Sequence, residues 1–217
     1  MAVNVGIVDY QMGNLRSVQK AVEQLGFEAT VSDDPKVLSL SSHLILPGVG
    51  AFGDAMAELN KRDLVPFLRS WADSNKPLFG ICLGMQLLFD TSEEGGNHKG
   101  LSILRGKVIK FQPPNSEALQ SNPLFKIPHM GWNQVATTYA NDEMLEGIQS
   151  EPYVYFVHSY YVQPENEEDV WLRTDYGSLF CSAVRRGNLF ATQFHPEKSQ
   201  KDGLQMLRNF LKRDSHF

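Results

Sequence analysis

Short apolar runs alternate with amphipathic stretches over residues 3–90. Val3–Val8 and Pro77–Ile81 are apolar on successive positions, which is typical of parallel strands buried on both faces. Between Leu15 and Leu25 the apolar residues instead recur at helical spacing. Strands are predicted at Val3–Val8, Phe27–Val31, His43–Leu46 and Pro77–Ile81, and helices at Leu15–Leu25, Ala51–Leu59, Leu64–Trp71 and Leu83–Phe89. This alternation predicts βαβ units on a parallel sheet with helices on both faces.

The second half of the chain is richer in strands. Aromatic and β-branched residues gather at Val108–Phe111, Tyr153–His158, Phe180–Arg185 and Leu189–Phe194, and a final helix is expected at Gly203–Lys212. The turn residues Gly187 and Asn188 between the last two strands predict a hairpin. We therefore expect one α/β domain over residues 1–217, with a mostly parallel central sheet and a more antiparallel second half.

Composition narrows the functional classes. Of the 217 residues, 42% are hydrophobic and 21% charged, which indicates a folded globular chain, and the net charge of −5 argues against nucleic-acid binding. No apolar stretch reaches the ~18 residues of a membrane span, and the N-terminal residues lack the basic segment of a signal peptide. Two cysteines cannot form a disulfide framework, so a reducing cytoplasm is expected.

The strongest local signal is Gly80-Ile81-Cys82-Leu83-Gly84, which joins a predicted strand to a predicted helix. It has the glycine-flanked form of a nucleophile elbow, in which a sharp turn exposes the central residue. The positive end of the following helix favours thiolate, and the Leu83 amide would face the oxygen of an attacked carbonyl. The alternative is that Cys82 is a buried structural cysteine.

A cysteine nucleophile needs a base, and six histidines are available: His43, His98, His129, His158, His195 and His216. His195 follows a predicted strand and begins His195-Pro196-Glu197, so in an extended segment His195 and Glu197 face the same way. His129 and His158 are expected to be hydrogen-bonded structural histidines. No two histidines have the close spacing of a zinc site.

Pro47-Gly48-Val49-Gly50 follows another parallel strand, the position where such sheets bind ligands. The two glycines allow the Val49 peptide to rotate, so its amide is a candidate switchable oxyanion donor; the alternative is an ordinary turn. Cys181 is expected to be a small core residue, and the acidic run Glu165–Asp169 a solvated loop. The residues alone indicate a cysteine-dependent acyl transferase or hydrolase.

Three of these motifs occur in the order found in class I glutamine amidotransferases, which the chain resembles: Pro47–Gly50, Gly80–Gln86 and His195–Glu197. Three further stretches are similar to the glutaminase subunits of imidazole glycerol phosphate synthases: Asp9–Leu15, Pro128–Asn133 and Phe156–Tyr161. The resemblance covers essentially the whole chain. One departure is Gln11, where that family commonly has glycine.

The resemblance implies the class I glutamine amidotransferase fold and a role for each matching residue. Cys82 would be the nucleophile, His195 the general acid and base, and Glu197 the residue that orients His195. The amides of Val49 and Leu83 would form the oxyanion hole. The substrate would bind at Gly50, Gln86, Ser159 and Tyr160. No cofactor or metal is implied.

The resemblance also implies a partner, a (β/α)8-barrel cyclase in histidine biosynthesis that consumes the ammonia. A barrel of ~250 residues does not fit in this chain, so the cyclase would be a separate polypeptide forming a heterodimer with it. Asn14 and Lys198 are candidates for that interface, although Lys198 could equally be an ordinary surface lysine. Two alternatives remain. The first keeps the triad and makes the chain a γ-glutamyl peptidase or the glutaminase subunit of a different amidotransferase. The second is an inactive amidotransferase-like binding module.

Overall fold

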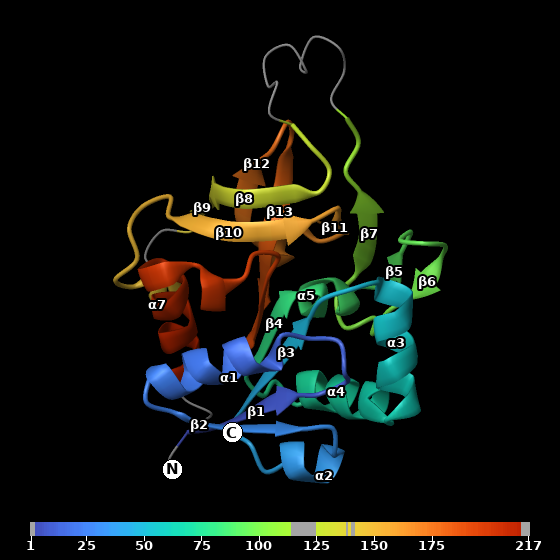
Figure 1. Cartoon of the computed structure of the whole chain (residues 1–217), viewed down its shortest axis with the longest axis vertical. Helices are drawn as coiled ribbons and strands as arrows, with labels where there is room; N and C mark the ends of the chain where they lie inside the picture. Colours follow the sequence, from blue (N-terminus) through green and yellow to red (C-terminus); the bar gives the residue numbers. More distant parts are fainter. Residues whose placement is uncertain (1–2, 114–124, 138, 140–141, 214–217) are drawn as a thin grey trace.

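The computed structural model describes residues 3–113, 125–137, 139 and 142–213, so His216 lies outside the described part (Figure 1). The first half contains β1 (Asn4–Val8), α1 (Leu15–Gln24), β2 (Glu28–Ser32), α2 (Pro35–Leu38), β3 (His43–Gly48), α3 (Phe52–Lys61), α4 (Leu64–Asp73), β4 (Leu78–Cys82) and α5 (Leu83–Leu87). The alternation of strands and helices predicted over residues 3–90 is confirmed.

The second half is mostly strands. They are β5 (Thr91–Ser92), β6 (His98–Lys99), β7 (Gly106–Lys110), β8 (His129–Gln134), β9 (Ala136–Thr137), β10 (Tyr153–His158), β11 (Tyr160–Pro164), β12 (Val170–Asp175), β13 (Leu179–Arg186) and β14 (Leu189–Thr192). Short 3-10 turns η1 (Glu143–Leu145), η2 (Glu167–Asp169) and η3 (Pro196–Lys198) precede the final helix α7 (Gln200–Leu211). The predicted hairpin is β13–β14, with Gly187 at a φ of 58° in its turn.

One large sheet crosses the molecule in the order β2-β1-β3-β4-β14-β13-β11-β7-β5-β6, with β12 and β9 joined beside β13 (Figure 1). The strands from β2 to β14 are parallel, whereas β13, β11 and β7 pair antiparallel. This is the expected division between a parallel first half and a more antiparallel second half. Because β14 lies between β4 and β13, the chain returns to the sheet centre for its final strand.

Alternating side chains of the central strands face two separate cores. Leu44 and Leu46 of β3 pack with the buried residues of α3, α4 and α5. Ile45 of the same strand packs instead with the buried faces of α1 and α7. A strand with apolar residues on successive positions therefore has both faces covered by helices, as the unbroken apolar runs predicted.

A separate two-stranded sheet pairs β8 with β10 and brings His129 opposite His158. The His158 Nδ1 donates to the Tyr160 carbonyl at 2.8 Å, and its Nε2 lies 3.0 Å from the His129 Nδ1. Burial lowers the pKa of His129 to about 4 and that of His158 to about 3, so both rings are neutral near pH 7. The prediction that they are hydrogen-bonded structural histidines is confirmed.

Two other sequence predictions have different outcomes. Cys181 is buried, and burial raises the pKa of its thiol to about 12, as expected of a core residue. The solvated loop predicted at Glu165–Asp169 is wrong at its last position, because Asp169 is only 5% exposed. Asp169 ends η2 immediately before β12, so it turns inward with that strand.

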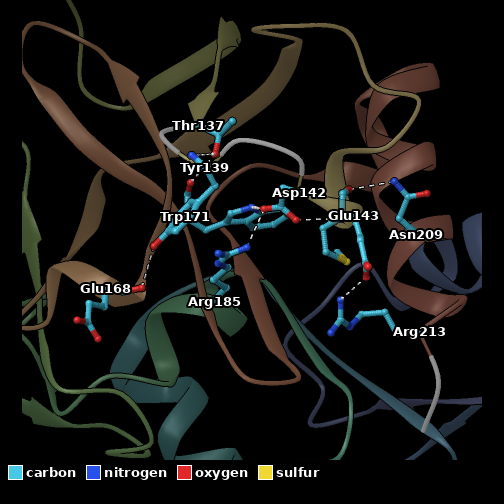
Figure 2. Close-up of polar contacts among 10 residues, drawn as sticks. Thr137, Tyr139, Asp142, Glu143, Glu168, Trp171, Arg185, Asn209 and Arg213 are labelled. Carbon is cyan, nitrogen blue, oxygen red and sulfur yellow. Dashed lines mark hydrogen bonds and ion pairs between the residues drawn. The ribbon is translucent and has the colours of Figure 1, made fainter.

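A buried carboxylate connects the strands of the second half to the loop before β10 (Figure 2). The Asp142 side chain forms an ion pair with Arg185 at 2.9 Å and accepts from the Trp171 Nε1 at 2.7 Å. It also caps η1 by accepting from the Met144 amide at 3.0 Å. Arg185 lies over the Tyr139 ring, with its guanidinium carbon 3.7 Å from the ring centroid. One carboxylate thereby fixes η1 against β12 and β13.

In the loop after β1, Gln11 adopts a backbone conformation that suits glycine. Gln11 has a φ of 63°, and its amide donates to the Asp9 carboxylate at 2.9 Å. Side chains with a Cβ are disfavoured in this left-handed region. The departure from the family's glycine thus leaves the backbone conformation in place at an energetic cost.

We predict that Gln11→Gly raises the free energy of unfolding by about 0.5–1 kcal/mol, because it removes most of that left-handed cost while adding some chain entropy. Urea unfolding at constant pH measures the change. Gln11→Ala is the control, since the exposed side chain is shortened while the strained φ remains, and its stability should stay near that of the parent. A Gln11→Gly protein no more stable than Gln11→Ala would contradict the prediction.

Candidate functional site

The carboxyl ends of β3 and β4 place two loops side by side. Gly48 pairs with Cys82 across these strands. Cys82 has a φ of 55° and a ψ of −109°, and the next residue, Leu83, begins α5. Such dihedrals are sparsely populated and persist only where surrounding packing imposes them. Their presence at a strand-to-helix junction is the geometry of a nucleophile elbow.

Close backbone packing explains the second glycine of the elbow. A Cβ on Gly84 would lie 1.8 Å from the Leu46 carbonyl oxygen, so no other residue fits there without moving β3 or α5. Leu83 is the first residue of α5, and the first amides of a helix have no partner within it. The Leu83 amide is therefore available as an oxyanion donor beside the sulfur.

His195 approaches the sulfur from the end of β14, which pairs with β4 in parallel up to Thr192 opposite Ile81. The His195 Nδ1 lies 2.8 Å from the Glu197 carboxylate, and both side chains are almost completely buried. Burial alone would lower the pKa of the imidazole, but its interactions with Cys82 and Glu197 raise that pKa to about 9. The raised pKa favours the imidazolium at neutral pH; its Nδ1 faces Glu197, and its buried Nε2 has no hydrogen-bond partner among the described residues.

A cavity of about 310 Å³ opens over the sulfur, large enough for a free amino acid. The sequence-predicted residues that line it are Val49, Gly50, Cys82, Leu83, Gln86, Ser159, Tyr160 and His195. Glu197 lies behind His195 and does not line the cavity. The structure thus gathers around one space the end of β4, the start of α5, the segment where β10 passes into β11, and the loops that follow β3 and β14.

One predicted donor is turned away from this cavity. The Val49 amide donates to the Met12 carbonyl at 2.9 Å, so it does not face the sulfur in this conformation. Gly50, which follows, has a φ of 102°. Of the two predicted oxyanion donors, only the Leu83 amide is available in this conformation. A rotation of the peptide that joins Gly48 to Val49 would break the bond from the Val49 amide to Met12.

Gln86 is held in a fixed orientation. Its Nε2 donates to the Tyr160 carbonyl at 3.0 Å and to the Gln193 Oε1 at 2.9 Å. Both amide hydrogens are used, so the Gln86 carbonyl oxygen is the atom left to meet a ligand. A ligand group bound there would need a hydrogen to donate.

Four residues of the site were missed by the sequence analysis: Val157, His158, Glu94 and Gln193. The first two lie on the strand β10, and the other two hold groups of the site in place. Glu94 lines the cavity, and its carboxylate accepts from the Phe52 amide at the start of α3 at 2.9 Å. Gln193 is fully buried, and its Nε2 lies 3.7 Å from the Cys82 sulfur. Their partners are distant in sequence, so no local motif indicates them.

The two predicted interface residues lie outside the cavity lining. Asn14 precedes α1 and is exposed, and Lys198 is half-buried in η3. A larger groove of about 580 Å³ lies beside η1 and β9, but neither cysteine nor histidine occurs among the described residues that line it. We therefore assign the chemistry to the smaller cavity.

Two kinds of feature are absent from the described part of the chain, a metal-binding cluster and a membrane-spanning helix. Among those residues no three His, Cys, Asp or Glu side chains are grouped so that they could hold a metal ion. None of the helices within the described ranges combines the length and apolarity needed to cross a bilayer.

Comparison with known proteins agrees with this geometry. Residues 6–213 match the family described as glutamine amidotransferase class-I. The chain is 53% identical over 206 residues to the imidazole glycerol phosphate synthase subunit HisH of Rhodopirellula baltica, covering 95% of this chain and 96% of that one. It is 51% identical to the subunit of the same name from Aquifex aeolicus, with 95% of each chain covered.

Solved structures share the fold at low sequence identity. A structure titled PurLQS from Thermotoga maritima superposes with a TM-score of 0.71 at 21% identity, covering 97% of this chain and 98% of that one. A structure described as a glutamine amidotransferase also gives 0.71 at 21% identity, over 96% and 97% of the two chains. The chain belongs to the class-I glutamine amidotransferase family and, within it, to the HisH subunits of imidazole glycerol phosphate synthase.

Proposed function

We propose that this chain hydrolyses glutamine to glutamate and ammonia and supplies the ammonia to a separate (β/α)8-barrel cyclase subunit. That subunit would make imidazole glycerol phosphate and aminoimidazole carboxamide ribonucleotide in histidine biosynthesis. The observation that carries the proposal is the buried His195–Glu197 pair, which shares the wall of an amino-acid-sized cavity with Cys82 at its elbow. Family membership gives this arrangement its substrate and its pathway.

The proposed chemistry proceeds through a thioester. The Cys82 thiolate attacks the side-chain amide carbon of glutamine, and the oxyanion that forms accepts from the Leu83 amide. His195, protonated at neutral pH, gives its proton to the departing ammonia and then takes one from the water that cleaves the thioester. Glu197 stabilises the ring whenever it is protonated, before ammonia leaves and again after water is activated. The products are glutamate, ammonia and the regenerated thiolate.

Two charged or polar groups of the cavity would recognise the amino-acid end of glutamine. The Glu94 carboxylate and the free carbonyl oxygen of Gln86 are both acceptors, which suits the α-ammonium group. The backbone of Ser159, Tyr160 and Gly50 would hold the α-carboxylate from the other walls.

We propose that the cyclase partner controls the rate by completing the oxyanion hole. The bond from the Val49 amide to the Met12 carbonyl keeps that donor away from the sulfur, and Gly48, which has no Cβ, permits the Gly48–Val49 peptide to rotate. Asn14 and Lys198 are the proposed contacts with the partner. The chain is proposed to act as a single glutamine amidotransferase domain over residues 1–217 in the cytoplasm, where its two free cysteines would stay reduced.

We predict that glutamate release by this chain is slow alone and rises by about 100- to 1000-fold with the cyclase subunit and its nucleotide ligand, which is the usual effect of one oxyanion donor on kcat. Glutamate production from glutamine is the measurement, and Cys82→Ala is the blank. Hydrolysis that requires Cys82 but ignores the partner would retain the chemistry and reject the pathway. Absence of hydrolysis under both conditions would reject the proposed function.

We predict that Glu197→Gln lowers the pKa of His195 from about 9 and reduces kcat at least about tenfold, because the ring loses its anionic partner. An NMR titration of the His195 ring measures the first effect, and an unchanged titration would contradict the prediction.

The raised pKa of His195 also predicts how the stability of the parent chain depends on pH. Since the folded pKa lies above the usual 6.5, the stability that the charged ring contributes is complete below pH 6.5 and lost as the pH rises through 9. Unfolding free energies at both ends of this window should differ accordingly.

We predict that Glu94→Gln raises the KM for glutamine by about 10- to 100-fold with little change in kcat, since a charge-assisted bond to the α-ammonium group is lost. The side chain introduced at position 94 keeps an oxygen that accepts from the Phe52 amide, so the start of α3 is preserved. Glu93→Gln is the matched control, because Glu93 accepts from the Lys110 amide and does not line the cavity. Equal effects of the two substitutions on KM would reject this role for Glu94.

A further inference from the structure

The Gln193 carboxamide bonds at both ends to other groups of the site. Its Nε2 lies 3.7 Å from the Cys82 sulfur, and its Oε1 accepts from the Gln86 Nε2 at 2.9 Å. The side chain is completely buried and does not line the cavity, so it cannot touch a bound substrate. Whatever it contributes to the reaction must act through its two partners.

The backbone of Gln193 is fixed as firmly as its side chain. Its amide donates to the Ser182 carbonyl of β13 at 2.8 Å, immediately after β14 ends. Phe194 beside it is fully buried, and the Thr192 hydroxyl donates to the Phe194 carbonyl at 2.9 Å. Gln193 is thereby a rigid support, two residues before His195, rather than a mobile side chain.

Chemistry at the two ends leaves one consistent orientation for the three groups. A thiolate can only accept hydrogen bonds, so Gln193 must present its NH₂ to Cys82 and its oxygen to Gln86. Gln86 must then donate, and its second hydrogen is bonded to the Tyr160 carbonyl at 3.0 Å. The only atom Gln86 has left for the cavity is its carbonyl oxygen. The Tyr160 carbonyl and the Gln193 oxygen, which can both only accept, thus fix together which atom Gln86 offers to the substrate.

We infer that Gln193 is a positioning residue that bridges the Cys82 sulfur and the Gln86 carboxamide and serves both. It stabilises the thiolate with one hydrogen bond and holds Gln86 as an acceptor with the other. The Gln86 carbonyl oxygen held in this way is the acceptor offered to the α-ammonium group of the substrate. This inference rests on the proposed function for its substrate, but its effect on the sulfur stands on geometry alone.

The experiment compares Gln193→Met, which has a similar volume and can neither donate nor accept as the amide does, with the parent chain. The first measurement is the rate of Cys82 alkylation by iodoacetamide against pH, quantified by peptide mass spectrometry. The pH midpoint should move upward by about one unit on loss of a bond to a charged group. The titratable groups around the sulfur are unchanged in the variant: Tyr10, Glu94, His158, His195 and Glu197.

The second measurement is the KM for glutamine in the complex with the cyclase, which should rise about tenfold as Gln86 loses its fixed orientation. In a Gln86→Met background, Gln193→Met should leave KM unchanged while still moving the alkylation midpoint. A further increase in KM in that background would show that Gln193 does not act through Gln86, which would overturn the inference.

Thr192→Val is the matched control, because it removes another buried hydrogen bond one residue away without touching Cys82 or Gln86. If it moves the alkylation midpoint as far as Gln193→Met does, the effect is general loosening and the inference fails. If Gln193→Met does not fold, Gln193→Asn replaces it, since the shorter amide cannot span both partners. An alkylation shift in a chain that does not hydrolyse glutamine would reject the proposed function and retain the role at the sulfur.

Discussion

The conformation of one residue, Cys82, is the constraint on which the site depends. Its φ of 55° and ψ of −109° turn the chain from β4 into α5 within a single step and aim the sulfur at the cavity. Holding a residue there costs about 1–3 kcal/mol. The close approach of Gly84 to the Leu46 carbonyl and the pairing of Gly48 with Cys82 supply the packing that imposes it. Core contacts of β3 and β4 therefore stabilise a strained nucleophile.

Electrostatics around the sulfur follow from which groups are buried together. The His129 and His158 rings lose their charge because burial is not compensated, and their pKa values fall to about 4 and about 3. His195 is also buried, yet its pKa rises to about 9, because Cys82 and Glu197 both favour the charged form. The same side chain thus becomes a neutral structural link or a cation according to its neighbours.

Local patterns predicted most elements of the first half, and short motifs pointed to Cys82, His195 and Glu197, because both depend on short-range signals. Apolar runs marked β1, β3 and β4, and the glycines around Cys82 marked the elbow. What the sequence could not predict depends on pairing between distant segments: Gln193 meets Cys82 and Gln86 at separations of 111 and 107 residues. The pairing of the Val49 amide with Met12 and the burial of Asp169 are likewise settled only by the folded arrangement of loops.

The position of β14 has a consequence for the chain as it is synthesised. Although it is the final strand of the described residues, it lies between β4 and β13 in the interior of the sheet. Chains emerge from the ribosome N-terminus first, so Cys82 is exposed to the cell well before His195 and Gln193 exist. During that interval the thiol lacks both its base and its hydrogen-bond donor. The Cys82 thiol of the nascent chain therefore lacks the groups that would activate it, and they reach it only when β14 enters the sheet.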